Sequence, residues 1–322
     1  MEVQHFQAKE PPCLIVASLL KAYLGFSEIS SCLVFNHHQT LVISGFLSYA
    51  LLLKRTFQLD VDNSINYINN IQESTNFHTY SNSEINQTLS PLHIWKKGHW
   101  VFLAFSQALI ISLNRLAAAI ANDQLAQAKL ELETTAELMY ASGAAMKLTG
   151  SFTREKYESE IRPTMMTGNH QSLVHSENLS GLMMWDHDYL INVICKQKIL
   201  PIIKTLPKIL EAEHEKIVLA YKCGISDGHK SICAEFGGGE IGSLIAASQS
   251  SAAIKTLKNF ENSRVKLLDP TGRIKGGCPL NQTLSAETCV NSDSQGKDFS
   301  AKDAILEEKN STSSPSQILN LF

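Results

Sequence analysis

The sequence predicts a mostly α-helical protein. Apolar side chains recur at helical spacing in several segments, and residues 122–149 consist almost entirely of strong helix formers. The strict alternation of apolar and polar residues that marks a half-buried strand does not persist anywhere along the chain. With 322 residues, 44% of them hydrophobic and 18% charged, the chain is long and apolar enough to bury a substantial core.

The N-terminal region, residues 1–85, is expected to contain two helices followed by polar loops. Helical spacing covers residues 1–35 and 40–56, and the second segment ends in Lys54 and Arg55, the charge that favours a helix C-terminus. Residues 60–85 are rich in Asn, Asp and Ser, a composition typical of loops or of short helices between loops.

Residues 86–262 are expected to form a helical core. A capping box of Ser81 and Glu84 predicts a short helix from about residue 83, which Pro91 would break or kink. From residue 263 to 322 the chain is rich in Ser, Asn and Gly, and we expect a flexible tail. Further core helices are predicted over 99–120, 122–149, 153 to about Pro163, 179–197 and 208–222.

Charge and cysteine content exclude several classes of protein. The net charge is −3 and there is no basic stripe with interleaved aromatic residues, which argues against nucleic-acid binding. The seven cysteines are odd in number and form no CxxC pair, so we expect neither a disulfide framework nor a structural zinc site. For the same reason we expect a cytoplasmic location. No signal peptide is evident, and the apolar runs are too short or too interrupted by polar residues to predict a membrane partner.

Residues 211–243 contain the most informative constellation, a histidine, His214, followed by the glycine run 237–239. A lone histidine on an amphipathic helix is usually a surface or core residue, but imidazole is also a common axial ligand of haem iron. The spacing Glu211-x-x-His214, with Asp186 and His187 upstream, is also compatible with a non-haem di-iron site. The residues alone do not decide whether His214 is a surface or core residue, a haem ligand or a ligand of a di-iron site.

Three segments, in the same order, resemble the haem dioxygenase superfamily that includes indoleamine 2,3-dioxygenase, and look closest to its bacterial branch around monodechloroaminopyrrolnitrin synthase. They are YESEIRP from Tyr157 to Pro163, EHEKIVLAYK from Glu213 to Lys222, and FGGGEIGSLI from Phe236 to Ile245. The resemblance covers roughly residues 40–260, and it is the combination and order of the segments that make it specific.

This resemblance implies an indoleamine 2,3-dioxygenase-like helical fold that binds haem b. By position, His214 would ligate the iron, and a glycine turn would cover the distal face. Arg162 would pair with the substrate carboxylate, for which a guanidinium fork is geometrically suited, and Tyr157 would wall the ring pocket. Glycine permits close backbone approach to a ligand at the turn, formed by Gly237, Gly238 and Gly239.

Two weaker matches and one departure complete the predicted site. SPLHIWKK would place Ser90 near the sixth coordination position of the iron, and VHSENLSGLMMWD would place Ser176 in a distal turn. Glu240 stands where the dioxygenases carry threonine, and its carboxylate could bind an ammonium or a guanidinium. His170 and His175 are candidates for a distal base, although their surroundings are more typical of loop histidines.

The resemblance therefore predicts a haem-dependent oxidative enzyme of specialised metabolism that acts on tryptophan or a derivative, with dioxygen as the second small-molecule partner. A first alternative is a haem-dependent hydroxylase of an aromatic ring or a guanidino nitrogen, which Glu240 motivates. A second is a non-haem di-iron oxidase, and a third is a helical binding protein without catalytic activity.

Overall fold

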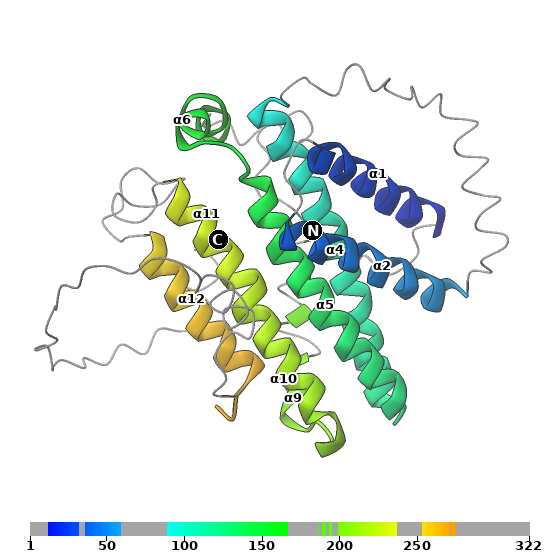
Figure 1. Cartoon of the computed structure of the whole chain (residues 1–322). Helices are drawn as coiled ribbons and strands as arrows, with labels where there is room; N and C mark the ends of the chain where they lie inside the picture. Colours follow the sequence, from blue (N-terminus) through cyan, green and yellow to red (C-terminus); the bar gives the residue numbers. More distant parts are fainter. Residues whose placement is uncertain are drawn as a thin grey trace, which may run out of the picture. The chain divides into compact units, whose positions relative to one another are not determined.

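The computed structural model describes residues 12–31, 36–58, 89–166, 186, 189–190, 193–194, 199–236, 253–270 and 272–274. All regular secondary structure within these ranges is helical, which confirms the predicted mostly α class (Figure 1). Residues 179–197, expected to be helical, are described only at scattered positions, and most of the expected tail lies outside the described residues.

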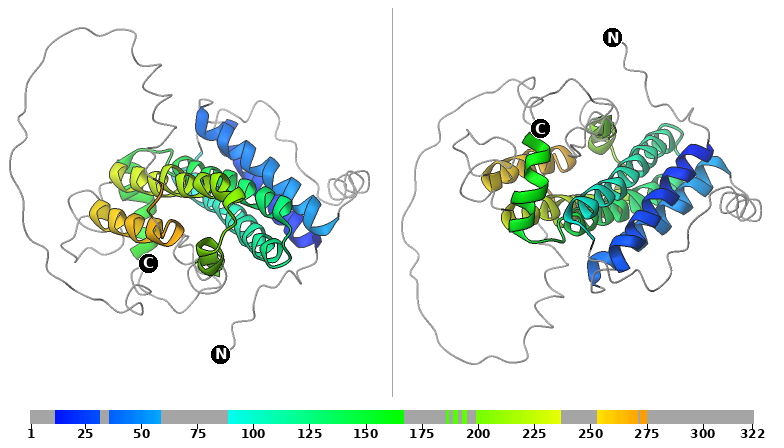
Figure 2. Two further views of the ribbon diagram at one scale, coloured as in Figure 1. Left: turned by 90° about the horizontal axis from the view of Figure 1, so that it is seen from below. Right: turned by 90° about the horizontal axis from the view of Figure 1, so that it is seen from above.

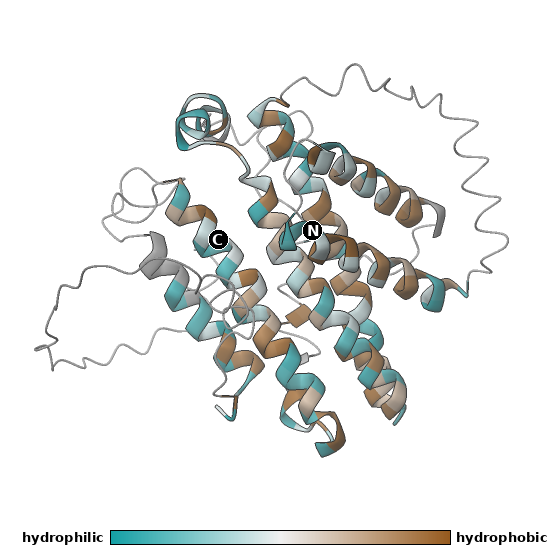
Figure 3. Ribbon diagram, in the orientation of Figure 1, coloured by the Kyte–Doolittle hydropathy of each residue, from teal (hydrophilic) through white to brown (hydrophobic). Residues whose placement is uncertain are grey.

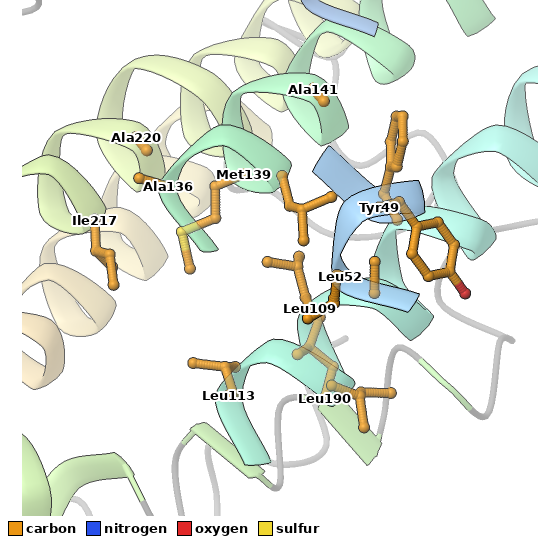
Figure 4. Packing of buried hydrophobic residues seen from close by; sticks show 14 of the residues in the cluster. Tyr49, Leu52, Leu109, Leu113, Ala136, Met139, Ala141, Leu190, Ile217 and Ala220 are labelled. Carbon is orange, nitrogen blue, oxygen red and sulfur yellow. The ribbon is translucent and has the colours of Figure 1, made fainter. Parts of the chain in front are cut away.

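Two long helices, α4 (Pro91–Ala121) and α5 (Leu125–Thr149), pack along each other and organise the rest of the described chain. Helix α1 (Pro12–Ser31) packs on α4, and α2 (His37–Phe57) packs on α5 (Figures 1 and 2). In the core between them, apolar side chains of α2, α4, α5 and the later helix α10 (Glu211–Ala220) meet, as Figure 4 shows for Leu52, Leu109, Met139 and Ile217.

Pro91 is the first residue of α4. The helix expected from residue 83 lies outside the described residues. Ser90 is the N-cap of α4, and its hydroxyl accepts a hydrogen bond from the His93 amide at 3.3 Å. Proline suits the first position of a helix because the amide it lacks would have no intrahelical partner there. Helix α4 thus starts eight residues before the predicted residue 99.

Two helices continue past the end that the sequence predicted, and each contains a π-helical segment. Pro163 does not stop the helix that begins at residue 154, which continues through α6 (Arg154–Lys156), η1 (Tyr157–Ile161) and α7 (Arg162–Met166). The helix with His214 continues from α10 through η5 (Tyr221–Ser226) into α11 (Asp227–Glu235). Such π-helical segments are frequent at functional sites.

The helical body extends past residue 262, where the composition predicted its end. Helix α12 (Ala253–Leu268) crosses this position, and Leu268 and Asp269 are buried. Two short segments, α9 (Ile199–Lys204) and η4 (Lys208–Leu210), lead into α10. The tail therefore contributes at least the end of α12 to the packed body.

Helices α5 and η5–α11 approach so closely that their backbones touch. A Cβ atom added to Gly143 would lie 2.2 Å from the carbonyl oxygen of Gly224, and one added to Gly228 would lie 2.6 Å from that of Gly143. Ala141, two residues from Gly143, instead faces Gly45 of α2. Helix α5 is therefore held from two sides, and glycine is required on the side of η5.

We expect Gly143→Ala to lower the free energy of unfolding by about 2–3 kcal/mol, because the backbone of η5 must move to admit the methyl group. Gly25→Ala is the matched control, since its Cβ would meet only the flexible Lys97 side chain, at 3.0 Å. Chemical denaturation of both variants measures the difference, and equal stability would contradict the close backbone contact.

Candidate functional site

Four aromatic rings gather where α4, η1 and α11 meet. We call them the aromatic cluster: Trp95, Phe152, Tyr157 and Phe236. Phe236 lies nearly parallel to two of the others, with its ring centroid 4.4 Å from that of Tyr157 and 5.2 Å from that of Phe152. Trp95 approaches Tyr157 more obliquely, at 6.2 Å and 60°. Offset and tilted ring contacts of this kind stabilise aromatic groups.

The hydroxyl of Tyr157 is buried and has no hydrogen-bond partner among the described residues. None of the surface of Tyr157 is exposed (0%). Burial raises the pKa of this phenol, and the nearby Arg162 opposes that rise. Since an unpartnered buried polar group destabilises a protein by about 1–3 kcal/mol, the hydroxyl requires an explanation.

His99 lies one helical turn after Trp95 and is neutral at physiological pH. Its ring packs against that of Trp95, with centroids 4.4 Å apart, and its Nδ1 lies 2.7 Å from the Trp95 carbonyl oxygen. Because a carbonyl only accepts, Nδ1 carries the proton and Nε2 keeps a lone pair. Burial lowers the pKa of His99 to about 4. His99 is not among the predicted site residues, although a histidine among the apolar residues of a predicted core helix is a visible signal in the sequence.

Arg162 begins α7, directly after the π-helical segment that contains Tyr157. Its Nη1 donates to both carboxylate oxygens of Glu158, at 2.7 and 2.9 Å. The side chain is 31% exposed, and ion pairs at such sites contribute at most about 1 kcal/mol. Because this ion pair is weak, the carboxylate of a ligand could replace that of Glu158 on Arg162 with only a small loss of free energy.

Cys233 lies on α11 beside Ile232, which packs into the same cluster. Its side chain is buried and forms no disulfide. Burial raises the pKa of the thiol to about 11, so it stays protonated at neutral pH. A protonated buried thiol is a poor nucleophile, which makes Cys233 a packing residue of the cluster in this structure.

The other residues predicted to lie near the distal side of the haem contribute less to this site or lie outside the described part of the chain. The Ser90 hydroxyl caps α4 and is committed to the His93 amide. Phe236 directly precedes the glycine run and belongs to the cluster. The remaining predicted positions fall outside the described residues and stay predictions: Ser176, Gly237, Gly238, Gly239, Glu240, His170, His175 and His187.

His214 lies in a different environment from Tyr157. Its side chain is buried beside aliphatic residues of the main core, among them Leu113, Met139 and Ile217. Its Nε2 lies 2.6 Å from the carbonyl oxygen of Leu268, to which it donates a hydrogen bond. Burial lowers the pKa of His214, which favours the neutral ring. The contact joins α10 to the end of α12, 54 residues further along the chain.

The described surroundings of His214 do not fit a haem group. The aliphatic lining would suit a porphyrin, but the cavity beside the ring measures about 10 Å³, the space of a single water molecule. The ring nitrogen Nε2 is already occupied by Leu268. Tyr157 packs in the aromatic cluster and not beside this cavity. The structure therefore gives His214 a structural partner and does not bring it together with Arg162 and Tyr157.

The di-iron alternative finds no support in the part of the chain that the structure describes. No group of three or more His, Cys, Asp or Glu side chains gathers there in a way that could hold a metal ion. Glu211 instead accepts a hydrogen bond from Arg273 at 2.5 Å, and Asp186 accepts one from Gln107 at 3.3 Å. The fourth proposed ligand, His187, lies outside the described residues.

Comparison with known proteins matches a stretch of the chain that includes Trp95, Phe152 and Tyr157 of the aromatic cluster but not Phe236. A family model described as SfmD 3-methyl-L-tyrosine peroxygenase matches residues 75–213. This stretch contains Trp95, His99, Tyr157 and Arg162, and it ends one residue before His214. The chain is similar to 3-methyl-L-tyrosine peroxygenases.

A 3-methyl-L-tyrosine peroxygenase from Streptomyces lavendulae is 27% identical over 192 residues, which is 58% of this chain and 50% of the relative. The chain thus matches about half the length of this curated relative. No solved structure matches the chain significantly, so the indoleamine 2,3-dioxygenase-like fold stays a prediction. The place of the chain near monodechloroaminopyrrolnitrin synthase likewise stays a prediction.

The neutral state of His99 predicts a pH dependence of stability. Its pKa in the folded protein is about 4, below the 6.5 of an unfolded chain, so the unfolded state binds the proton more readily. The stabilisation is complete above pH 6.5 and is lost as the pH falls towards 4, by about 3 kcal/mol in all. Urea unfolding at pH 7 and pH 4 measures it. His99→Gln should reduce this pH-dependent loss, and an unchanged loss would contradict the assignment.

Proposed function

We propose that this protein is an oxidative enzyme of specialised metabolism that acts on an aromatic amino acid, and that the aromatic cluster is where the substrate ring binds. The observation that carries the proposal is the partnerless buried hydroxyl of Tyr157, next to Phe236 and Arg162. It lies within the stretch that resembles 3-methyl-L-tyrosine peroxygenases, which supports an oxidation of this kind.

Each residue of the site would have a separate task. Arg162 would exchange Glu158 for the substrate carboxylate, since both present the same two oxygens to the guanidinium. The substrate ring would take up ring contacts like those that Phe236 now makes with Tyr157 and Phe152. The Tyr157 hydroxyl would gain the hydrogen-bond partner that it lacks. Holding the substrate in one orientation, away from water, is the contribution of these groups to catalysis.

A tyrosine-type substrate fits the site better than the tryptophan expected from the sequence. A phenol carries a hydroxyl that can both donate and accept, and so can pair with the Tyr157 hydroxyl. The name of the relative, a 3-methyl-L-tyrosine peroxygenase, supports a phenolic amino acid and a peroxide as the oxidant. Among the described residues, no acidic side chain of the aromatic cluster favours a guanidino substrate.

Haem b is the cofactor that we propose, on the sequence resemblance alone. When bound, haem iron supplies the oxidising centre for reactions of this class. The surroundings of His214 do not fit the group, and no iron ligand is assigned among the described residues. The proposal for the substrate site depends on the aromatic cluster and not on the identity of that ligand.

Tyr157→Phe separates a functional hydroxyl from a structural one. The free energy of unfolding should stay within about 1 kcal/mol of the parent or rise, because a buried group without a partner is removed. Peroxide-dependent oxidation of 3-methyl-L-tyrosine by the haem-reconstituted chain, followed by mass spectrometry, should fall about tenfold, the effect of one lost hydrogen bond. Lower stability with unchanged turnover would contradict the proposal.

Arg162→Gln should raise the KM for the amino acid by at least tenfold, because the variant loses the charge that binds the carboxylate. Its stability should change by less than about 1 kcal/mol, as expected for a partly exposed ion pair. Arg154→Gln is the matched control, an exposed arginine eight residues earlier in the same helical segment. Equal effects of the two substitutions on KM would show that Arg162 does not bind the carboxylate.

A further inference from the structure

The π-helical turn of η1 brings Arg162 to the side of the helical segment that carries Tyr157. The backbone amide of Arg162 donates its hydrogen bond to the carbonyl oxygen of Tyr157, five residues earlier. These two residues are therefore one turn apart, whereas in an α-helix, with about 3.6 residues per turn, residues five apart point to different sides. Burial raises the pKa of the Tyr157 phenol, the charge of Arg162 opposes that rise, and the charge of Glu158 adds to it. Both charged groups therefore lie near the phenol.

The ion pair between Glu158 and Arg162 uses one of the three guanidinium nitrogens. Both carboxylate oxygens of Glu158 accept hydrogen bonds from Nη1, at 2.7 and 2.9 Å. The other two nitrogens, Nε and Nη2, donate no hydrogen bond to any of the described residues. A guanidinium binds a carboxylate most strongly through two parallel N–H···O bonds from different nitrogens. Arg162 thus keeps donors for a stronger carboxylate contact than the one it makes with Glu158.

The ion pair is accessible from solvent, although the phenol near it is buried. The side chains of Arg162 and Glu158 are 31% and 37% exposed, whereas Tyr157 is 0% exposed. The segment labelled α6 in Figure 1, which leads into η1, is mostly teal in Figure 3, the colour of hydrophilic residues. A ligand can therefore reach the ion pair from water, with the hydroxyl that lacks a partner nearby.

When a substrate carboxylate replaces Glu158 on Arg162, as proposed above, Glu158 loses its cation. Arg162 is its ion-pair partner in the described part of the chain, and the exposed Arg154 and Lys156 of the same segment form no ion pair with it. A carboxylate without a partner, next to an incoming carboxylate, weakens binding because like charges repel. The exchange therefore favours a ligand that brings a positive charge together with its carboxylate.

We propose that Glu158 binds the α-ammonium group of the substrate while Arg162 binds its carboxylate, so that the two residues together select an amino-acid zwitterion. This inference rests on the proposed function and adds to it a residue that determines specificity. The ammonium and the carboxylate of an α-amino acid are bonded to the same carbon atom, so they reach the two neighbouring side chains together. Two charge-assisted contacts then replace the one between Glu158 and Arg162, and no charge is left unpaired.

A purely structural role for the ion pair predicts a different pattern of binding. Ion pairs between residues four apart are common on exposed helices, where they stabilise the helix slightly. In that case, loss of the Glu158 charge would affect all ligands of the site alike. In the proposed role, the loss affects only ligands with an ammonium group, and a ligand without one gains because Glu158 no longer competes for Arg162. Comparison of two ligands therefore separates the two roles.

Isothermal titration calorimetry of the full-length, haem-reconstituted chain makes this comparison with 3-methyl-L-tyrosine and with its deaminated analogue, in which hydrogen replaces the amino group. The parent should bind the amino acid about tenfold more tightly than the analogue. Glu158→Gln should reduce this preference, the ratio of the two dissociation constants, about tenfold, without weakening the analogue. Glu158→Asp keeps the charge on a shorter side chain and should restore part of the preference.

Glu160→Gln is the matched control, because Glu160 is an exposed carboxylate of the same η1 segment and forms no ion pair with the described residues. It should keep the preference of the parent, and circular dichroism verifies that each variant is folded. The inference is overturned if Glu158→Gln keeps the preference, or if Glu160→Gln lowers it equally. The proposed function stands in those cases, provided that the parent binds the amino acid and Arg162→Gln weakens that binding. If the parent binds neither ligand, the proposed substrate site is wrong as well.

Discussion

The described fold depends on the backbone contact between α5 and the η5–α11 helix. Gly143 and Gly224 lie where no Cβ atom could be accommodated, so the two helices are closer than side chains would allow. Because of this close approach, α11 packs along α5. Phe236, at the end of α11, then lies beside Tyr157 and Phe152. Without the three glycines of this contact, the ring that stacks on Tyr157 would be displaced.

The same packing separates two environments that the sequence resemblance had joined. On one side, Phe236 closes an aromatic cluster that contains a hydroxyl without a partner and adjoins an arginine held by a weak ion pair. On the other, His214 is surrounded by aliphatic side chains, and its Nε2–H donates a hydrogen bond to the carbonyl oxygen of Leu268. Among the described residues, the hydroxyls of Tyr49 in the main core and Tyr157 in the aromatic cluster are both buried without a hydrogen-bond partner, and Tyr157 is the one that has Arg162 near it.

The sequence predicted the helical class from local spacing, and the resemblance to the dioxygenases singled out Tyr157 and Arg162, which lie near each other in the structure. It did not reveal η1 and η5, since nothing in the local pattern distinguishes a π-helical segment from an α-helix. It could not show the partner of His214 either, because the Leu268 carbonyl is 54 residues away and any residue could provide it. His99 was not predicted either: its place among the apolar residues of a predicted core helix was visible in the sequence, but its burial and its contact with Trp95 were not.

The proposed substrate site is a buried place in which the Tyr157 hydroxyl has no hydrogen-bond partner among the described residues. The most direct test of the central claim is an experimental structure of the protein with 3-methyl-L-tyrosine bound. We predict the amino-acid carboxylate on Arg162 and a hydrogen bond to the Tyr157 hydroxyl. A ligand bound beside His214, with the Tyr157 hydroxyl still unpartnered, would contradict the account.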